Sequence, residues 1–363
     1  MINKSYLDLK KEVWDVGTCS GCGACVAVCP CDNIFFMEDE PMRVGCDQIK
    51  CGKLESSESP LSFEFCKVTN YNVKCGACYD ACPRTSSSIL TKKVPESSIG
   101  EYIEIKTAKA IKSNDSVQSG GVVTALLAEA FDEDLIDGAI VMLEDKWTME
   151  PESFLATSKE EVLKSSGSRY SWNVPILEAL REAVYDKKLK RLAIVGTPCV
   201  MESINSIVNS NNDLLKPFEK AIRFKIGLFC YETMKYGPLI EMLKKEGINP
   251  WDIKKMEIGK GKFIVILDNG NIKSYKIKEL EQIVRTGCKY CKDFTGYPSD
   301  LSVGNVGSPE GVSTIIIRNN WGKGLFDKAI INRYIEVKDP VKTEDITKLA
   351  EMKIRDRKDI SIN

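Results

Sequence analysis

Beyond about residue 105, hydrophobic and polar positions follow the patterns of helices and strands that alternate along the chain. Apolar residues between Val122 and Ala130 fall on one face of a helix that begins after a pair of glycines. Residues 263–277 predict a β-hairpin, because the Asn-Gly pair between its two apolar segments tolerates the positive φ of a tight turn. Continuous apolar runs predict buried strands, and amphipathic patterns predict further helices: strands at 138–143, 192–195, 224–229 and 313–317, helices at 175–184 and 325–331.

The N-terminal region differs from the rest, because residues 1–90 show little periodicity and hold eleven of the fifteen cysteines. We therefore expect a mixed α+β and α/β chain, in which a small cysteine-rich domain precedes a larger α/β domain. The expected divisions are a cysteine-rich domain at 1–95, two parts of the α/β domain at 96–190 and 191–345, and a charged, peripheral C-terminal tail at 346–363.

The composition excludes several classes of function. The net charge is −1 and acidic and basic residues are interspersed, so no surface for nucleic acid is predicted. No apolar run is long enough to span a membrane, and residues 1–15 lack the apolar core of a signal peptide, which predicts a cytoplasmic protein. Free thiols without an export signal indicate a reducing, anaerobic cytoplasm. Histidine is absent, which removes Rieske centres, histidine zinc sites and histidine acid–base catalysis.

The most specific motif is the spacing C-x-x-C-x-x-C-x-x-x-C-P, which begins at Cys19. Bacterial ferredoxins use this spacing to hold 4Fe–4S clusters. A second, shorter motif, C-x-x-C-x-x-x-C-P, begins at Cys75. In two-cluster ferredoxins the last cysteine of each motif binds the cluster of the other motif. The predicted ligands of the first cluster are therefore Cys19, Cys22, Cys25 and Cys82.

The second ferredoxin cluster lacks one expected ligand. Its three regular ligands are predicted to be Cys29, Cys75 and Cys78. The position expected for the fourth is Asn72, and a neutral amide is a poor ligand for iron. Cys66 is the favoured substitute and Cys46 and Cys51 are the other candidates, with a three-iron cluster or no cluster as the alternative. Cys31 is interpreted as a buried thiol, and the pair Cys46 and Cys51 leaves a further metal site open.

Four more cysteines lie in the α/β region, each where a strand ends or a loop turns. They are Cys199, Cys230, Cys288 and Cys291. Ligand sites in α/β sheets assemble where strands end. Four thiols without histidine suit a third 4Fe–4S cluster, which we favour, or an all-cysteine zinc site. Structural core cysteines are the remaining alternative.

Two glycine-rich loops suggest contacts with the phosphates of a cofactor. The first, Gln118-Ser119-Gly120-Gly121, opens an apolar helix, where backbone N–H groups attract anions. The second spans 304–311 and follows the last cysteines closely. No Rossmann fingerprint and no Walker A motif occurs in the chain, so neither a Rossmann NAD site nor a P-loop is predicted.

Several of these segments, in this order, resemble a known family. They are Gln118–Leu127, Gly196–Cys199, Gly227–Cys230, Cys288–Thr295, Asp300–Gly304 and Gly311–Thr314. Together they resemble the beta subunits of coenzyme F420 hydrogenases and dehydrogenases over about 100–335. The N-terminal module resembles the ferredoxin module fused to this family in the input subunit of reduced-F420 dehydrogenase.

The resemblance implies a flavin-binding α/β catalytic domain with FAD, a nearby 4Fe–4S cluster, and coenzyme F420 as substrate. It implies that the cluster nearest the flavin is held by the four late cysteines, which brings the expected total to three clusters. It also implies flavin contacts by Gln118, Ser119, Gly120, Gly121, Thr197, Gly304, Asn305 and Gly307. Asn305 stands where many members have an acid, and Val312 stands where many have tryptophan.

The implied activity is an F420-dependent oxidoreductase, in which hydride passes between F420 and FAD. Single electrons then pass through the clusters to a partner redox subunit of dehydrogenase, hydrogenase or heterodisulfide reductase type, including one at a membrane surface. Without histidine, Lys289, Tyr231 and Glu232 are the candidate proton donors beside the late cysteines, with solvated surface residues as the other interpretation. A ferredoxin-dependent flavoprotein reductase of a small organic substrate, without F420, is the alternative function. A relay subunit without flavin is a third.

Overall fold

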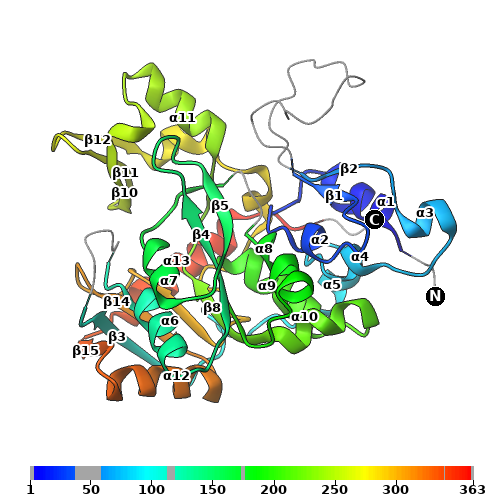
Figure 1. The fold of residues 1–363 in the computed structure, drawn as a ribbon. Coiled ribbons are helices and arrows are strands. Elements are labelled where there is room, and N and C mark those ends of the chain that lie inside the picture. Colours follow the sequence, from blue (N-terminus) through cyan, green and yellow to red (C-terminus); the bar gives the residue numbers. More distant parts are fainter. Residues whose placement is uncertain (1–3, 37–58, 113–118, 173–175, 339, 361–363) are drawn as a thin grey trace.

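A computed structural model describes residues 4–36, 59–112, 119–172, 176–338 and 340–360 of the 363. Its centre is a mixed eight-stranded sheet (Figure 1). In spatial order the strands are β15 (Ile335–Lys338), β3 (Glu104–Ala110), β14 (Ser313–Ile317), β13 (Leu301–Gly304), β8 (Ile222–Leu228), β7 (Leu192–Gly196), β4 (Gly138–Glu144) and β5 (Pro151–Ala156). The predicted strands at 138–143, 192–195, 224–229 and 313–317 are thereby confirmed.

Four central strands, β13, β8, β7 and β4, run parallel to one another. Strand β14 is antiparallel to both β13 and β3, so β3 runs in the same direction as the central four. The carboxyl ends of these five strands therefore share one edge of the sheet. Loops that follow strands at such an edge commonly form ligand sites.

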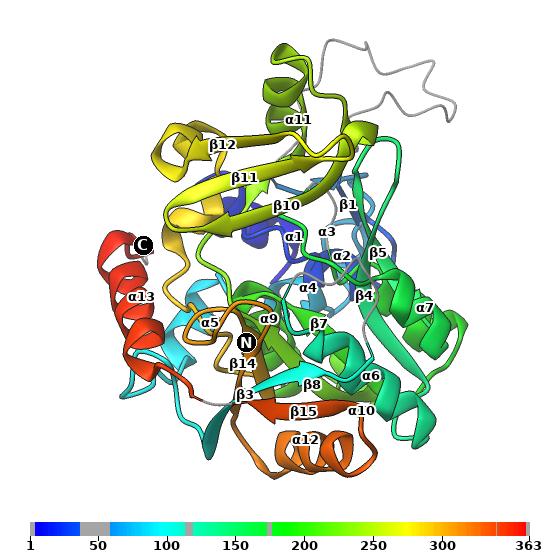
Figure 2. The ribbon, with the colours of Figure 1, turned by 90° about the vertical axis from the view of Figure 1, so that its left-hand side faces the viewer.

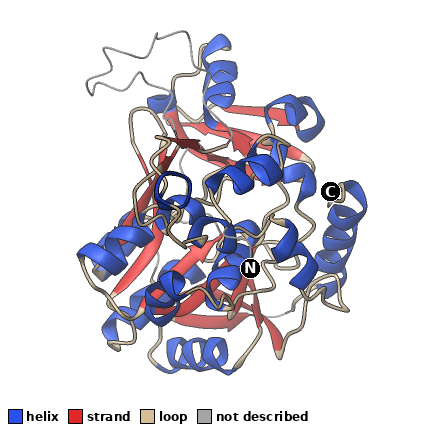
Figure 3. Ribbon diagram, turned by 90° about the vertical axis from the view of Figure 1, so that its right-hand side faces the viewer, coloured by secondary structure: helices blue, strands red, loops and turns tan. Residues whose placement is uncertain are grey.

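Helices cover both faces of this sheet (Figure 3). One face carries α6 (Val122–Asp132), α7 (Lys159–Lys164) and α12 (Asn320–Ile331). The other carries α8 (Ala179–Arg181), α9 (Pro198–Val208) and α10 (Lys216–Ala221). In β4, Ala139 and Val141 pack on the first face and Ile140 packs on the second. Burial of both faces explains why these strands are continuous apolar runs.

The three helix predictions beside the sheet differ in outcome. The helix after Gly121 and the helix at 325–331 are present, the second beginning earlier, at Asn320. The predicted helix at 175–184 is shifted, since α8 begins at Ala179 and continues as the π-helix η2 (Glu182–Asp186).

A separate antiparallel sheet lies beside the main sheet, at the opposite end of the molecule from α12 (Figure 2). It consists of β10 (Ile253–Gly259), β11 (Lys262–Leu267) and β12 (Ile272–Lys276), and it packs with α11 (Tyr236–Lys245) around a core of its own. Strands β11 and β12 form the predicted hairpin, and Gly270 has the positive φ of +84° that its tight turn requires. Shorter elements nearby are β6 (Ser171–Trp172), β9 (Met234–Lys235), and the 3-10 helices η4 (Pro250–Asp252) and η5 (Ile277–Ile283). A further 3-10 helix, η3 (Asp213–Leu215), directly precedes α10 beside the main sheet.

The N-terminal module is built from short helices and one small two-stranded sheet. Its elements are α1 (Tyr6–Leu9), the π-helix η1 (Lys10–Trp14), α2 (Ala24–Ala27), β1 (Ile34–Phe35), β2 (Leu61–Ser62), α3 (Lys67–Tyr71), α4 (Ala77–Asp80) and α5 (Ser86–Thr91). The two cysteine motifs adopt the same local fold, because each enters a one-turn helix through a glycine with positive φ. These glycines are Gly23 and Gly76, at +83° and +72°.

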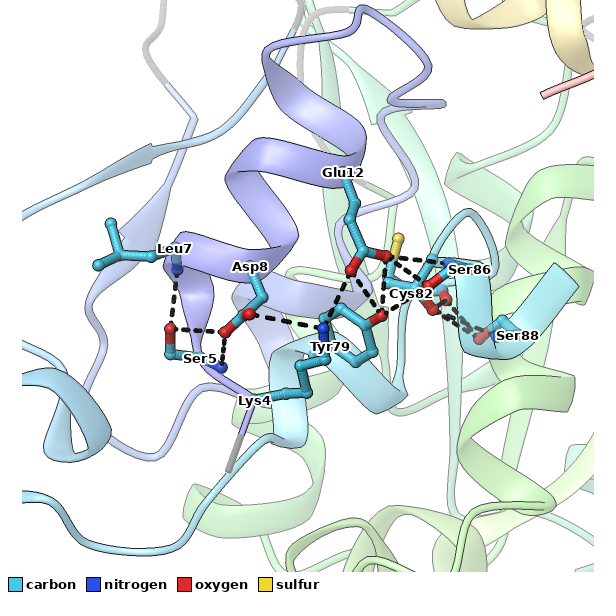
Figure 4. A network of polar contacts seen from close by, with 10 residues as sticks. Lys4, Ser5, Leu7, Asp8, Glu12, Tyr79, Cys82, Ser86 and Ser88 are labelled. Atoms are coloured by element: carbon cyan, nitrogen blue, oxygen red, sulfur yellow. Dashed lines mark hydrogen bonds and ion pairs between the residues drawn. The ribbon is translucent and has the colours of Figure 1, made fainter. Parts of the chain in front are cut away.

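The first helix is fastened to the second cysteine motif through the carboxylate of Glu12 (Figure 4). The Tyr79 hydroxyl donates to it at 2.7 Å, the backbone N–H of Ser86 at 3.0 Å, and the Lys4 ammonium lies 3.1 Å away. Partial burial opposes ionisation of Glu12, but these hydrogen bonds outweigh it and hold the pKa at about 2. The carboxylate therefore remains charged and fixes the two segments to each other.

The C-terminal segment is not peripheral, in contrast to the expectation from its charge. Residues Thr343–Asp356 form the helix α13, whose Ile346, Ala350 and Lys353 are buried. The apolar side of α13 packs against Ile99, Phe294 and Ile316. Within the described ranges, no helix is long and apolar enough to cross a membrane.

Candidate functional site

Four cysteines from both ferredoxin motifs line one cavity with an empty volume of about 310 Å³. They are Cys19, Cys22, Cys25 and Cys82. Cys82 belongs to the second motif, so the structure brings together the set predicted from the exchange of last ligands. Trp14 and Arg84 complete this part of the wall. Burial raises the pKa of the Cys19 thiol to about 11, and both burial and the neighbouring thiols raise the pKa of Cys25.

Backbone N–H groups donate hydrogen bonds to several of these sulfur atoms. Gly21 donates to Cys19, Ala77 to Cys75, and Arg84 to Cys82. In each case the donor lies two residues after the cysteine, which reflects the shared local fold of the motifs. Such N–H···S bonds surround the cysteine ligands of iron–sulfur clusters and tune their potentials. The cavity, the thiols and the donors together fit a 4Fe–4S cluster.

The second predicted set is also gathered, and it includes Cys66. Burial raises the pKa of Cys78, and the charges of Cys29, Cys75 and Cys66 beside it raise that pKa further. Asn72 ends α3 in the left-handed conformation, with φ of +52°, whereas Cys66 lies at the start of the same helix. The two ends of α3 therefore differ: Asn72, at the position expected for the first ligand, carries no thiol, and Cys66 at the other end places a thiol near Cys78.

A fifth thiol lies close to this second set. Cys31 is among the neighbours that raise the pKa of both Cys29 and Cys75, after burial. The guanidinium of Arg181 donates to the carbonyl of Cys29 at 2.6 Å and fixes this loop against α8. Cys46 and Cys51 lie outside the described residues.

The four late cysteines meet beside the carboxyl edge of the main sheet. Cys199 lies in the first turn of α9, Cys230 follows β8, and Cys288 and Cys291 lie in and after the 3-10 helix η6 (Thr286–Tyr290). Burial raises the pKa of Cys230 to about 12, and the nearby charges of Cys288 and Cys291 contribute. Burial likewise raises the pKa of Cys199, and Cys291, Cys22 and Cys230 add to the effect.

The presence of Cys22 among the neighbours of Cys199 places the late set next to the first ferredoxin set. One backbone contact supports this order. Gly287, which precedes Cys288, packs so closely on Cys19 that an added Cβ would lie 2.6 Å from the carbonyl carbon of Cys19. Since Cys25 of the first set also neighbours Cys78 of the second, the three sets form a row. The three cysteine sets therefore form one continuous series through the protein.

Three buried cations lie between or beside these sets. Lys353 of α13 donates to the carbonyls of Cys230 and Asp293 at 2.6 and 2.7 Å, and its Nζ lies 3.5 Å from the Cys291 sulfur. Arg84 donates to the carbonyl of Tyr290 at 2.7 Å. Arg285 is buried, and its charge lowers the pKa of both Cys19 and Cys288, although burial dominates for these thiols. Sequence spacing gave no signal for Lys353, because it comes from α13, a segment remote from the thiols beside it.

A single metal ion does not fit these sets. Within the described part of the chain, no three cysteine or acidic side chains converge closely enough to hold one ion. A 4Fe–4S cluster makes no such demand, because each cysteine binds a different iron atom at a separate corner.

The predicted flavin loops lie along the carboxyl edge of the sheet, but their glycines are needed for packing. The N–H of Gly120 donates to the Ser313 hydroxyl at 3.0 Å, and a Cβ at Gly120 would lie 2.6 Å from the Ala108 carbonyl oxygen. The Ser119 hydroxyl also contacts Ser313, at 3.0 Å. Gly121 has φ of +68° at the start of α6. Gln118 lies outside the described residues.

The other loop residues follow the neighbouring strands. Thr197 precedes α9, with its hydroxyl 3.3 Å from the Cys199 sulfur. Gly304 ends β13, and a Cβ there would lie 2.6 Å from the Cβ of Phe229, with the ring closer still. Asn305 follows directly, and Gly307 accepts a hydrogen bond from the N–H of Lys342 at 2.7 Å, just before α13. The predicted residues are thus brought to one edge, beside Cys199 and Cys230.

The three candidate proton donors contact the C-terminal segment. The Tyr231 hydroxyl donates to Asp356 at 2.9 Å, and burial together with this bond raises its pKa to about 12. The carboxylate of Glu232 accepts from Arg357 at 2.7 Å. Lys289 is exposed on η6, and its carbonyl accepts from the N–H of Lys358. Two of the three candidates are therefore engaged in bonds that oppose proton transfer.

Comparison with known proteins identifies the family. The model of the coenzyme F420 hydrogenase/dehydrogenase beta subunit matches with its N-terminal part at 105–181 and its C-terminal part at 189–343. One chain of the solved F420-reducing [NiFe] hydrogenase complex of Methanosarcina barkeri superposes with a TM-score of 0.67 at 30% identity, covering 73% of this chain and 92% of that chain. The protein belongs to the family of coenzyme F420 hydrogenase/dehydrogenase beta subunits, whose members are components of F420-dependent oxidoreductases.

Several relatives match along nearly the whole chain. An uncharacterized protein of Methanocaldococcus jannaschii is 54% identical, over 96% of this chain and 97% of its own length. One subunit of the F(420)H(2) dehydrogenase of Methanosarcina mazei is 32% identical over 94% of this chain and 91% of that subunit. The coenzyme F420-dependent sulfite reductase of M. jannaschii is 34% identical over 95% of this chain, which spans 50% of that enzyme.

Proposed function

We propose that this protein is an FAD-containing iron–sulfur oxidoreductase that transfers hydride between coenzyme F420 and FAD. It passes single electrons through 4Fe–4S clusters to a partner redox subunit. The observation that carries the proposal is the cavity lined by four cysteines of both ferredoxin motifs, next to the set of four late cysteines. Family membership supports the F420-linked part, since the named relatives are F420-dependent enzymes and subunits.

The cysteines of this chain would hold three clusters. Cys199, Cys230, Cys288 and Cys291 would hold the inner one, and Cys19, Cys22, Cys25 and Cys82 the next. Cys29, Cys66, Cys75 and Cys78 would hold the third, at the distal end of the row. The backbone N–H donors and the buried cations around these sulfurs stabilise negative charge on them. The side chains therefore favour a chain of one-electron carriers over an isolated site.

The carboxyl edge of the sheet is the proposed place of the flavin. Bound there, FAD supplies two-electron exchange with F420 and one-electron exchange with the clusters. Ser119, Gly121, Thr197 and the loop 304–307 would contact it, because all lie at this edge and Thr197 also contacts Cys199. Gly120 contributes by close packing on the sheet, since its N–H is already bonded to Ser313. Gln118 is proposed from the sequence motif.

The proton that accompanies flavin reduction would come from solvent or from Lys289. Lys289 is exposed beside the late cysteines, whereas Tyr231 donates to Asp356 and Glu232 pairs with Arg357. The partner would be a redox subunit of a dehydrogenase, hydrogenase or heterodisulfide reductase complex in the cytoplasm. It would take electrons at the distal set, which lies farthest along the row from the late cysteines.

Anaerobic purification of the whole chain, followed by quantification of iron, sulfide and flavin, tests the proposal. We expect about twelve irons, about twelve sulfides and one FAD per chain, as three 4Fe–4S clusters and a flavin require. Reduced F420 should then lose its electrons to a one-electron dye only in the flavin-loaded protein. A protein that holds iron and sulfide but binds neither flavin nor F420 would refute the proposal.

A further inference from the structure

Arg84 occupies an unusual position between two cysteine sets. It follows α4 directly after the Cys82-Pro83 pair, only 6% of it is exposed, and it lines the cavity of the first set. Its Nη1 donates to the carbonyl of Tyr290, the residue that precedes Cys291 of the late set. The Arg84 side chain thus lines the cavity of the first set and is bonded to the loop that carries Cys291 of the late set.

Most of the hydrogen-bonding capacity of this guanidinium is not satisfied by protein. The buried Nε and Nη2 atoms have no hydrogen-bond partner among the described residues, and Nη2 lies 3.9 Å from the Glu202 carboxylate. A buried donor without an acceptor is unfavourable, so such donors normally indicate an absent acceptor. The cavity that Arg84 lines is bounded by four thiols, and cluster sulfur is a hydrogen-bond acceptor.

The positive charge of this region is not cancelled by Glu202. That carboxylate also pairs with Lys92, so two cations share one anion. A net positive charge remains beside Cys82, Cys199 and Cys291, which are the thiols that interact with Arg84. Since an added electron makes a cluster more negative, a fixed cation favours the reduced form and raises the reduction potential.

We propose that Arg84 is a positioning residue that electrostatically joins the inner cluster to the neighbouring ferredoxin cluster. Its free N–H groups donate to sulfur of the group held by Cys19, Cys22, Cys25 and Cys82, while its bond to Tyr290 fixes the loop of Cys291. One electron moves between the two clusters, no bond forms or breaks, and the guanidinium keeps its proton throughout. This inference rests on the proposed function, because it requires both clusters.

Redox titration of Arg84→Met, followed by electron paramagnetic resonance, tests the proposal. We expect the equilibrium constant for reduction of the first-set cluster to fall about tenfold, which is about 59 mV for a one-electron couple. Arg84→Lys keeps the charge and should recover at least half of this shift. Arg169→Met is the matched control, because Arg169 is a largely buried arginine whose charge interacts with Glu144 and not with a cysteine. Unchanged potentials in Arg84→Met, with full iron content, would overturn the proposal.

A second measurement uses the wild-type protein and does not depend on the stability of a variant. Protein labelled with nitrogen-15 arginine should show a nitrogen-15 hyperfine coupling in pulsed resonance spectra of the reduced cluster. The coupling should disappear in Arg84→Lys, which separates Arg84 from the nearby Arg285. A labelled protein with intact clusters and no coupling would contradict the hydrogen bond. Absence of iron and sulfide from the wild type would instead refute the proposed function.

Discussion

Replacement of Gly287 by alanine should separate the inner cysteine set from the first ferredoxin set. Gly287 lies in η6, one residue before Cys288, and it packs on the backbone of the Cys19 loop. An added Cβ would lie 2.6 Å from the carbonyl carbon of Cys19, closer still to the carbonyl oxygen, and 3.1 Å from the Cα of Ser20. All three atoms are backbone, so no side chain can rotate away, and a chain segment must move by about 1 Å.

The cost of this movement follows from packing energetics. Overpacking a buried contact costs about 1–3 kcal/mol, and a clash with rigid backbone falls at the upper end of that range. At roughly 2–4 °C per kcal/mol for a domain of this size, the melting temperature should fall by about 6 °C or more. Because the displaced segments carry Cys19 and Cys288, iron content should fall as well.

The assay is thermal unfolding of the iron-loaded protein under anaerobic conditions, with iron measured in the same samples. Gly259→Ala is the control, since a Cβ at Gly259 meets nothing within 4 Å and its φ is not positive. A Gly287→Ala protein that melts within about 1 °C of this control and keeps its iron would show that η6 and the Cys19 loop do not pack as described.

Three further predictions test other parts of the structure. Cys66→Ser should remove about a third of the iron, whereas Cys31→Ser should leave the iron content unchanged. Iron analysis of both variants measures this, and equal losses would reject Cys66 as the ligand. Glu12→Gln should lower the free energy of unfolding by about 1–2 kcal/mol after allowance for solvent screening. The pKa of Glu12 in the folded protein is about 2, below the ordinary value of 4.5, so the difference in unfolding free energy between wild type and variant should be constant above about pH 4.5 and shrink as the pH falls towards 2. Urea unfolding at several pH values measures this difference. A difference that stays constant down to pH 3 would contradict the lowered pKa. Lys353→Met should lower the melting temperature and make α13 sensitive to proteolysis, because the carbonyls of Cys230 and Asp293 lose their buried donor. A variant whose α13 resists proteolysis as well as the wild type would refute this role of Lys353.

The grouping of the cysteines could be predicted from the sequence because their spacing is local information. The spacing that begins at Cys19 fixes the order of three thiols around one cavity, and the motif with Cys82 supplies the fourth by the known exchange of ligands. Cys66 is predicted as the substitute only because Asn72 cannot serve, and the structure places Cys66 at the start of α3, near Cys78. Strands were predictable where both faces of the sheet are buried, since burial makes their sequences continuously apolar.

The C-terminal helix and the buried cations could not be predicted in this way. Helix α13 buries only a narrow side around Ile346 and Ala350, so its composition resembles that of an exposed segment. Lys353 reads as a surface residue in the sequence, and only the folded chain shows that it meets carbonyls from two distant loops. Glycines at 120 and 304 are predicted cofactor contacts, and the structure adds a second cause for them, the close packing of backbone on a strand or a ring. A pattern in sequence does not distinguish these two causes.

The core of the N-terminal module continues without a break into the helices of the main sheet. Ala24 and Ala27 of α2 and Ala77 of α4 share one apolar cluster with Leu177 and Met201. A module packed in this way cannot diffuse away as a free ferredoxin does. Under the proposed function, the distances between its cysteine sets and the late cysteines are therefore set once, during folding. If the gene is cut near codon 95, each of the two polypeptides carries one side of this apolar interface. The two should therefore associate when they are produced in the same cell.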